Sequence, residues 1–481
     1  NSYIDYNLNE NNILFPIYPV QPPIPKSNTK KSPFIINQYT YSKDDFYSPP
    51  LVNVENIGFM RGIRLARLAI CPFAYNPVKK ILRIYYEITA TLNFDNANIP
   101  ATKELKKLNS TPYFNNSNNN IFNFKPLLST KDYITKPPIK YVIVSPITYQ
   151  AVLQPFIEWK TKKGFIVIEA YTNNPQVGNT TTSIKNYLKN LYNAGTPSDP
   201  PPSFVLFVGD VDQIPSFNGT TGSHVTDLYY CEYTNDFLPE VYYGRFSCSN
   251  TTELQTQINK TIEYEQYLMP DDSFLNEVVM IAGADASMSP TYANGQINYG
   301  VSTYFNASNG LTSNTYLYPN PPNTSSQIKQ NVSNGCAFVN YTAHGSSNGW
   351  ADPSFTVADI SNLQNSGKYP LMVGNACLTN KFDEPVCFGE ALLRANNKGA
   401  LGYIGASDYT YWDEDYYWSV GAKNITASPT YDPNALGAYD RTFHTHGEAY
   451  DEWYVTQGQM IFAGNLAVTE ISSSYDIFPN N

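Results

Sequence analysis

The sequence lacks three features that mark common classes of protein. No run of about eighteen apolar residues occurs, so no segment is long enough to span a membrane as a helix. There is no stripe of Lys and Arg, and the formal net charge is −10, which argues against nucleic acid as a partner. The six cysteines form no CxxC pair, so neither a zinc site nor a dense disulfide framework is indicated. An acidic chain of this kind is better matched to a substrate that carries a positive charge.

The length and the beginning of the chain also limit the possibilities. A chain of 481 residues is too long for one ordinary core, so we expect at least two domains. The sequence opens with Asn1 and has no basic and then apolar leader. This is typical of an exported precursor from which a signal peptide has been removed.

Residues 1–131 differ in composition from the rest of the chain. They are rich in Pro and Asn and contain short alternating strands, such as the segment KKILRIYYEITATLNF at residues 79–94. We therefore predict a small all-β domain here. It ends in the polar segment NSTPYFNNSNNNIFNF followed by KPLLSTKDYITKPP, whose composition is that of an exposed linker that a protease could cut.

Residues 132–481 show the pattern of a second, larger α/β domain. Apolar runs alternate with amphipathic helical segments, which predicts a mainly parallel sheet sandwiched by helices. The predicted strands are KYVIVS, FIVIEAY, SFVLFVGD, EVVMIAGAD, AFVNYTAHG, YPLMVGNAC and GALGYIGAS. Ligands bind beyond the carboxyl ends of such strands, and these runs end in small and reactive residues.

A histidine and a cysteine at two of these strand ends predict a thiol hydrolase. His344 is the one of the four histidines that directly follows a buried-looking strand and precedes a glycine, and Cys377 ends the next such strand. An imidazole beside a thiol favours the nucleophilic thiolate and then protonates the departing amine. Asp285, at the end of a third strand, is the candidate that orients the histidine. The backbone N–H groups of Gly345 and Cys377 are candidates for an oxyanion hole.

Each of these motifs also has a less specific interpretation. A lone cysteine or histidine is more often a packed core residue, and GAD is more often a turn. A non-enzymatic surface protein, such as an adhesin or haemagglutinin with Tyr-rich binding loops, is therefore the alternative from another class, because a fold alone does not determine function.

Five segments resemble the gingipains, the cysteine peptidases of family C25. They are NYTAHGSSNGWADP, GNACLTNKFDEPVCFGEALLR, KGALGYIGASDYTYWDEDYYWSVGA, VTDLYY and AGNLA, in the family's order and with nearly its spacing. The resemblance covers most of residues 140–470 and is strongest to the lysine-specific members. It implies a caspase-like fold, with Cys377 as nucleophile, His344 as base and Asp285 as the third member.

The resemblance also implies how the substrate is selected. Asp415 and Thr342 would bind the ammonium group of a lysine, and Trp412 would form an apolar wall along its methylene stem. The residues alone leave other interpretations open. Asp227 is a rival acid for the same pocket, WDEDYYW is consistent with a solvated acidic turn, and one carboxylate also attracts arginine, so arginine or mixed basic specificity is the second choice.

Calcium is the cofactor that the resemblance implies. Asp236, the Leu238 carbonyl and Glu240 match one site of the family, although an acidic ligand expected there is replaced by Thr234. The Phe382 carbonyl and Glu390 match a second site. Oxygen ligands of this kind suit calcium, and no redox or nucleotide cofactor is expected.

By position and β character, residues 1–131 resemble the family's inhibitory prodomain, so the chain is expected to be a zymogen that is inhibited by its own prodomain. We predict that Lys26 occupies the lysine pocket, with Lys30 and Lys31 as the next choices, and that the enzyme cuts its own linker between Lys131 and Asp132. The chain ends at Asn481 without the WEAYHxxGD-like segment and the further domains of the family, so we expect a C-terminally shortened form. We also expect a monomer that is secreted by, or held on the surface of, a bacterium.

Overall fold

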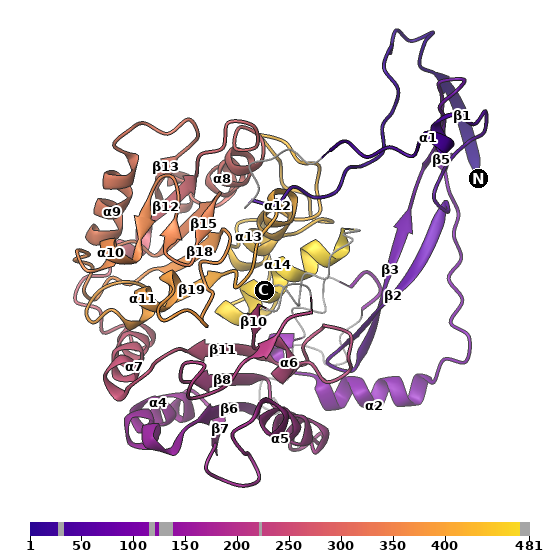
Figure 1. Cartoon of the computed structure of the whole chain (residues 1–481). Coiled ribbons are helices and arrows are strands. Elements are labelled where there is room, and N and C mark those ends of the chain that lie inside the picture. Colours follow the sequence, from indigo (N-terminus) through magenta and orange to yellow (C-terminus); the bar gives the residue numbers. More distant parts are fainter. Residues whose placement is uncertain (27–32, 115–120, 125–137, 221–223, 472–481) are drawn as a thin grey trace.

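A computed structural model describes residues 1–26, 33–114, 121–124, 138–220 and 224–471. Two parts are evident in Figure 1. A large body of helices and strands contains the chain from residue 138 onwards, and the N-terminal region lies along one side of it and projects beyond it. The segment that follows the first strand runs from this projection back to the body, where it reaches helix α12. The N-terminal region therefore contacts the body at more than one place.

The lower part of the body is a four-stranded parallel sheet with the order β11-β8-β6-β7. Its strands alternate in the face to which their side chains point: Val142 and Val144 pack with α5, whereas Ile143 packs with α4 and α7. Both faces are thus buried, as in a parallel sheet between two helical layers. The elements are β6 (Ile139–Ser145), β7 (Phe165–Tyr171), β8 (Phe204–Val208), β11 (Tyr242–Phe246), α4 (Gln150–Lys162), α5 (Thr181–Asn193) and α7 (Thr251–Glu265).

The upper part of the body is a five-stranded parallel sheet with the order β13-β12-β14-β18-β19. Helix α14 packs against β11 of the lower sheet and β19 of the upper sheet and so joins the two. The strands are β12 (Glu277–Ala282), β13 (Thr312–Tyr316), β14 (Phe338–Thr342), β18 (Leu371–Asn375) and β19 (Gly402–Gly405). The helices are α8 (Tyr292–Thr303), α9 (Thr324–Asn334), α10 (Val357–Ile360), α11 (Phe388–Arg394), α12 (Trp412–Val420), α13 (Ala438–Thr442) and α14 (Gln457–Glu470).

Short elements connect the longer ones. They are β9 (Phe217–Asn218) with β10 (Val225–Thr226), α6 (Leu228–Cys231), and the small antiparallel sheet β15 (Gly345–Ser346), β16 (Gly349–Trp350) and β17 (Phe355–Thr356). The last sheet begins directly after His344, so it fixes the direction in which the chain leaves β14.

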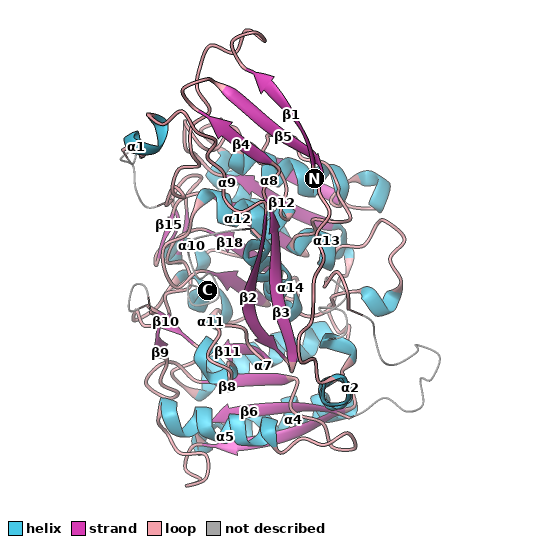
Figure 2. Ribbon diagram, turned by 90° about the vertical axis from the view of Figure 1, so that its right-hand side faces the viewer, coloured by secondary structure: helices cyan, strands magenta, loops and turns pink. Residues whose placement is uncertain are grey.

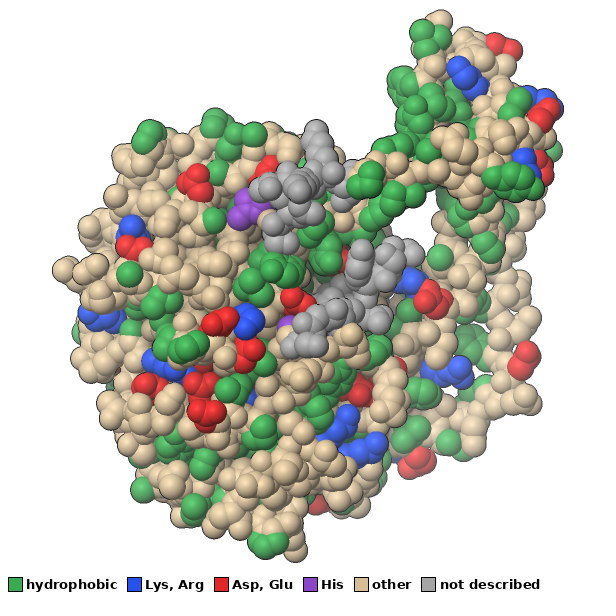
Figure 3. Space-filling view, viewed as in Figure 1, with side chains coloured by type: hydrophobic (Ala, Val, Ile, Leu, Met, Phe, Trp, Pro, Cys, Tyr) green, Lys and Arg blue, Asp and Glu red, His purple; other side chains and the backbone are tan. Residues whose placement is uncertain are grey.

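The N-terminal region contains two small antiparallel sheets. An outer sheet, β1-β5-β4, projects from the body, and the hairpin β2-β3 lies along the body beside α14 (Figures 1 and 2). Hydrophobic side chains gather on the projecting part, which agrees with the exposure of Tyr3, Ile4 and Phe73 (Figure 3). The elements are β1 (Ser2–Asn7), α1 (Gln38–Tyr41), β2 (Val52–Met60), β3 (Ile63–Ile70), β4 (Phe73–Asn76), β5 (Ile81–Glu87) and α2 (Ile99–Asn109).

The predicted fold class is confirmed, with three refinements. Each of the seven predicted strands of the larger domain is present, but β11 and β13 were not anticipated, and the strands divide between two sheets. The N-terminal region is mainly β but also contains α2, which an all-β prediction omits. Asn98 caps this helix and Pro100 lies in its first turn, both of which are ordinary helix-start signals. Within the described ranges, no helix is both long and apolar enough to cross a membrane.

Candidate active site

Three neighbouring strands bring Asp285, His344 and Cys377 to one edge of the five-stranded sheet. In the parallel register, Thr342 at the end of β14 lies beside Asn375 at the end of β18. His344 and Cys377 each follow two residues after these partners, so the register alone brings imidazole and thiol to adjacent positions. Strand β12 lies on the other side of β14 and leads to Asp285. This is the crevice beyond the carboxyl ends of the strands that the sequence predicted.

The imidazole of His344 is held by Asp285. His344 Nε2 lies 3.0 Å from Asp285 Oδ2, which leaves Nδ1 as the ring nitrogen that faces the crevice. The other carboxylate oxygen, Oδ1, accepts hydrogen bonds from the backbone N–H groups of Ser287 and Met288 and from the Ser287 hydroxyl. Burial would raise the pKa of Asp285, but the bonds from Met288, Ser287 and His344 together lower it. The carboxylate is therefore ionised and fixed in direction.

Cys377 is buried beside the loop that follows β19. The backbone N–H of Thr410 donates to its Sγ at 3.3 Å. Burial raises the pKa of the Cys377 thiol, and the hydrogen bonds from Thr410 offset this only in part. Gly345 is required for close packing here, because a Cβ at that position would lie 2.9 Å from the Cβ of Ala376 and 3.0 Å from the Cys377 carbonyl. The thiol of the intact chain is thus mostly protonated and shielded.

A lysine from the N-terminal region fills a pocket beside these residues. Lys26 is 1% exposed, and its Nζ lies 2.7 Å from Asp415 Oδ2. The same ammonium group donates to Thr342 Oγ1 at 3.0 Å and to the Asn375 carbonyl at 2.7 Å. It lies 4.7 Å from the centroid of the Trp412 ring, so one wall is aromatic. The three predicted pocket residues, Asp415, Thr342 and Trp412, are all brought together.

The backbone around Lys26 pairs with the loop that leads into α12. Lys26 N–H donates to the Thr410 carbonyl at 2.8 Å, and Trp412 N–H donates to the Ile24 carbonyl at 3.2 Å. The segment therefore adds an antiparallel strand to this loop, as extended peptides commonly do at an exposed edge. The Lys26 carbonyl contacts His344 Nδ1. A peptide backbone and a lysine side chain are thus held across the catalytic pair.

Two contributors to the pocket were not predicted, and one rival is excluded. The Asn375 carbonyl and Thr410 act through backbone groups, and the type of a residue does not reveal such a role. Their positions in the sequence were the available signal: Asn375 lies shortly before Cys377, and Thr410 follows the last strand of the sheet. Asp227 does not line the pocket, because both of its oxygens pair with Arg245, at 2.8 and 2.7 Å. Lys30, Lys31, Lys131 and Asp132 lie outside the described residues.

The first predicted calcium group offers hard oxygen donors. Thr234 Oγ1 lies 2.8 Å from Asp236 Oδ2 and 3.1 Å from Glu240 Oε1, so the hydroxyl lies between the two carboxylates. Burial, followed by the charges of Asp236 and Glu232, raises the pKa of Glu240 to about 8. Closely spaced carboxylates of this kind, of which Glu240 is buried, are what a hard divalent cation neutralises, so this group fits calcium. Among the described residues no cluster of three His, Cys, Asp or Glu side chains suits a metal, and the Leu238 carbonyl would have to complete the set.

The second predicted calcium group does not fit the ion. Glu390 Oε1 accepts from Arg394 Nη2 at 2.7 Å and from the Ser247 hydroxyl at 2.6 Å. Its other oxygen accepts from the backbone N–H of Cys387 at 2.9 Å. Both oxygens are engaged and the charge is already balanced by a guanidinium, so Glu390 and the Phe382 carbonyl offer no free anionic donor.

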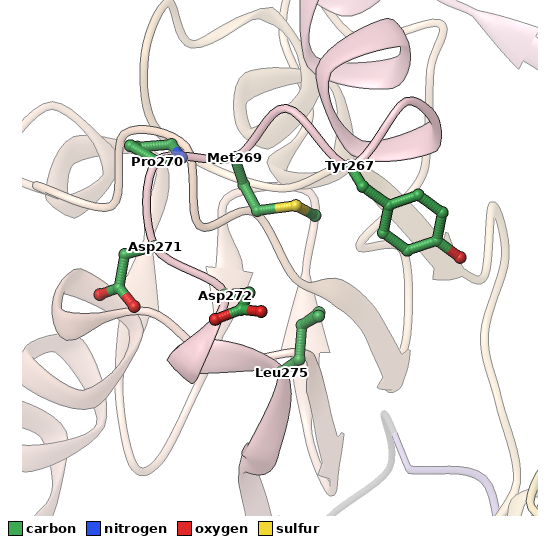
Figure 4. Close-up of a pocket in the computed structure, with 6 residues that line it drawn as sticks. All are labelled: Tyr267, Met269, Pro270, Asp271, Asp272 and Leu275. Atoms are coloured by element: carbon green, nitrogen blue, oxygen red, sulfur yellow. The ribbon is translucent and has the colours of Figure 1, made fainter.

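A separate surface hollow lies away from the catalytic crevice (Figure 4). It is lined by the segment between α7 and β12, and its Asp271 pairs with Lys368. Tyr267 points along one side of it, as Figure 4 shows. None of its lining residues belongs to the catalytic group, so it has no part in the site described above.

The fold and the site together define a cysteine peptidase. The model of peptidase family C25 matches residues 134–476, and that of the C25 propeptide matches residues 8–127. The chain therefore belongs to peptidase family C25.

Similar proteins support this classification. Lys-gingipain of Porphyromonas gingivalis is 38% identical over 456 residues, which is 94% of this chain and 26% of that protein. This chain thus spans about a quarter of the length of that relative. A solved structure described as a protease superposes with a TM-score of 0.65 at 40% identity, covering 69% of this chain and 72% of the other. The Arg-specific cysteine proteinase gingipain R superposes with a TM-score of 0.56 at 23% identity over 71% of this chain and 75% of the other, which supports the fold.

Proposed function

We propose that this chain is a latent, secreted cysteine endopeptidase of a bacterium that cleaves peptide bonds after lysine. Residues 132–481 form the catalytic domain and residues 1–131 the inhibitory prodomain. The observation that carries the proposal is the position of Lys26, whose ammonium lies 2.7 Å from Asp415 while its carbonyl contacts His344. A lysyl substrate bound in the same way would present its carbonyl to the catalytic pair.

The chemistry follows from the different partners of the two imidazole nitrogens. Asp285 accepts from Nε2–H, so Nδ1 is free to take the proton of the Cys377 thiol as the thiolate attacks the lysyl carbonyl. His344 then donates that proton to the departing amine, and water hydrolyses the thioester with His344 again as base. The backbone N–H groups of Gly345 and Cys377 would stabilise the oxyanion, a role that stays a prediction.

Specificity for lysine follows from the hydrogen-bond acceptors of the pocket. A compact ammonium is bound by three oxygens at 2.7–3.0 Å, one each from Asp415, Thr342 and Asn375. The planar guanidinium of arginine is wider and needs a forked acceptor, so it matches this arrangement less well. The name of the similar Lys-gingipain points in the same direction. Arginine or mixed basic preference is the alternative, and matched lysyl and arginyl peptides decide between them.

That comparison is the main test of the proposed function. We expect the processed enzyme to cleave lysyl peptides with a kcat/KM at least about 100-fold above that for arginyl peptides of the same sequence. We also expect a lysyl chloromethylketone to alkylate Cys377, as read by mass spectrometry of the peptide that contains it. Equal cleavage of both peptides would refute lysine specificity, whereas absence of cleavage and of labelling would refute the peptidase.

Latency is proposed to come from Lys26 as a substrate-like plug. Replacing Lys26 by Ala removes the ammonium and stem from the pocket, so Cys377 of the uncut chain should react much faster with the chloromethylketone. Lys43→Ala is the matched control, because Lys43 packs over Tyr39 in the N-terminal region, away from the pocket. Unchanged labelling of Lys26→Ala would rule out Lys26 as the plug.

Maturation is proposed to occur by cleavage of the linker after Lys131. Mass spectrometry of the active enzyme should give an N-terminus at Asp132. A mature chain that begins elsewhere would contradict this site without affecting the assignment of the catalytic residues.

Calcium is proposed to bind Asp236, the Leu238 carbonyl and Glu240, where it would stabilise the loop between α6 and β11.

We also propose that the enzyme is a monomer, which light scattering of the purified chain tests directly.

A further inference from the structure

A second buried cation of the N-terminal region lies far along the chain from Lys26. Arg61 is 1% exposed and stands at the tip of the hairpin β2-β3. Met60 pairs with Ile63, so Arg61 and Gly62 form a two-residue turn, and both have positive φ, 47° and 77°. Such turns favour Asn-Gly, and a residue with a long side chain in the left-handed region is strained. The position of an arginine here calls for a compensating contact.

That contact is made with the catalytic domain. Arg61 Nη1 donates to the Pro202 carbonyl at 2.7 Å and to the Glu240 carbonyl at 2.9 Å. Nη2 donates to the Pro201 carbonyl at 3.2 Å and to Ser203 Oγ at 3.4 Å, and Nε donates to the Asn109 carbonyl at 2.8 Å. The acceptors are neutral oxygens, four of them from the catalytic domain. A buried guanidinium satisfied in this way uses its rigid fork of donors, which lysine lacks.

Aromatic and apolar packing surrounds the guanidinium. Its central carbon lies 4.5 Å from the ring centroid of Phe114 and 5.7 Å from that of Tyr192. Phe114 is itself fully buried and stacks on Tyr242 of the catalytic domain at 4.1 Å. Met60 joins the same core cluster. The N-terminal region therefore contributes a small core of its own side chains to the catalytic domain at this place.

We propose that the catalytic domain has a second prodomain-binding site, separate from the active site, whose centre is the receptor for Arg61. The receptor consists of Tyr192, the carbonyl groups of Pro201 and Pro202, Ser203 and the Glu240 carbonyl. The partner it fits is a hairpin tip that presents an arginine beside apolar side chains. This site holds the prodomain after the linker is cut and independently of the plug. The inference depends on the proposed separation of residues 1–131 as a prodomain, but not on peptidase activity.

The test uses the full chain with Cys377→Ala, which cannot process itself, and a recognition sequence for a site-specific protease placed between residues 125 and 137. After cleavage, size-exclusion chromatography shows whether the two fragments stay together, and dilution gives their dissociation rate. We expect co-elution for the parent and for Lys26→Ala. In Arg61→Met we expect dissociation to be about 100-fold faster, because the carbonyl groups lose buried charged donors.

Two controls keep the result interpretable. Arg64→Met changes an exposed arginine of the same hairpin whose Nε donates to Asn56 Oδ1 within the hairpin, and it should behave as the parent. Arg61→Lys keeps the charge but loses the fork, and we expect dissociation about tenfold faster than that of the parent. Hydrogen exchange of β2 and β3 in the uncut variants shows whether the hairpin is still folded.

The outcomes separate clearly. If Arg61→Met and Arg61→Lys both dissociate no faster than Arg64→Met, or if Lys26→Ala alone releases the prodomain, the second site is refuted. If Arg61→Met unfolds the hairpin in the uncut chain, the Arg61→Lys rate decides. Because Cys377→Ala is inactive in every case, failure of the lysine-specific function would leave these rates unchanged and would be seen only with the peptide substrates.

Discussion

The two places where the N-terminal region enters the catalytic domain each bury one cation, yet they use different chemistry. Lys26 and Arg61 are both 1% exposed. Lys26 faces a carboxylate, a hydroxyl and a carbonyl in the pocket proposed for the substrate, whereas Arg61 faces neutral oxygens and aromatic rings. A single carboxylate at the end of a pocket can exchange one cation for another. Several carbonyl groups that accept from one guanidinium are better suited to a partner that remains bound.

The largest expected effect is on activity, and it follows removal of the nucleophile beside the Lys26 pocket. Cys377→Ala should lower kcat for lysyl peptides by about 10⁴-fold or more, because no other group replaces the thiolate. It should leave the contact of the prodomain intact, since the Cys377 thiol bonds to Thr410. The measurement is steady-state kinetics after an added site-specific protease has cut the linker of parent and variant, because Cys377→Ala does not process itself.

Cys387→Ala is the control for that prediction. Cys387 is also buried, and burial raises its pKa, but it lies at the start of α11, outside the pocket. Loss of activity in Cys387→Ala equal to that in Cys377→Ala would contradict the assignment of the nucleophile.

Neutralising the carboxylate of the pocket should have the next largest effect. Asp415→Asn removes the ion pair with the ammonium, and kcat/KM for lysyl peptides should fall by about 30-fold to 1,000-fold. Asp413→Asn, two residues earlier on α12, is the matched control because it neutralises a carboxylate of the same helix and keeps the ion pair of Lys26 with Asp415. The Arg61 contact should not respond to either change. Equal losses in the two variants would show that the charge of the helix, and not this carboxylate, selects lysine.

The pH dependence of thiol reactivity should distinguish the plugged pocket from an open one. Burial raises the pKa of Cys377, so the reactive thiolate forms only at a pH above its ordinary range in the intact chain. Removal of Lys26 opens the pocket to water but also removes an ammonium whose charge lowers the pKa of Cys377. Because burial is the largest cause of the raised pKa, the profile should still move to lower pH, with iodoacetamide labelling about tenfold faster at about pH 8. Arg61→Met in the uncut chain should shift it less. Identical profiles for the parent and Lys26→Ala would contradict burial by the plug.

Calcium should give the smallest effect, and its proposed site lies close to Arg61: Asp236 and Glu240 are in the loop that contacts the hairpin. Asp236 accepts a hydrogen bond from the backbone N–H of Phe59 in β2, so this loop touches the hairpin as well. Saturating calcium should raise the melting temperature by about 1–3 °C through binding to the folded state, and Asp236→Asn should abolish the increase. Differential scanning calorimetry with a chelator as reference measures it. An equal increase in Asp236→Asn would place the ion elsewhere.

The sequence predicts well that Asp285, His344 and Cys377 follow neighbouring strands at one sheet edge, because the information there is local. Each apolar run predicts a strand, and reactive residues directly follow three of these strands. The split into two sheets was not predictable, since it depends on which strands pair over long distances, and β11 and β13 are short and partly polar. Arg61 in a hairpin turn reads as an ordinary solvated charge. Its burial becomes visible only when the carbonyl groups of residues 201, 202 and 240 are brought together by folding.

The segment between β1 and Lys26 has a further consequence for durability. It is a tether fixed at one end by the pairing of β1 with β5 and at the other by the loop before α12. Residues 1–25 contain neither lysine nor arginine, and prolines occupy positions 16, 19, 22, 23 and 25. Proline restricts the backbone to extended conformations. Because it lacks an N–H, it also cannot donate the backbone hydrogen bond by which a peptide pairs with a neighbouring strand. An enzyme with basic specificity therefore finds no bond to cut along the stiff tether that delivers its own inhibitory residue.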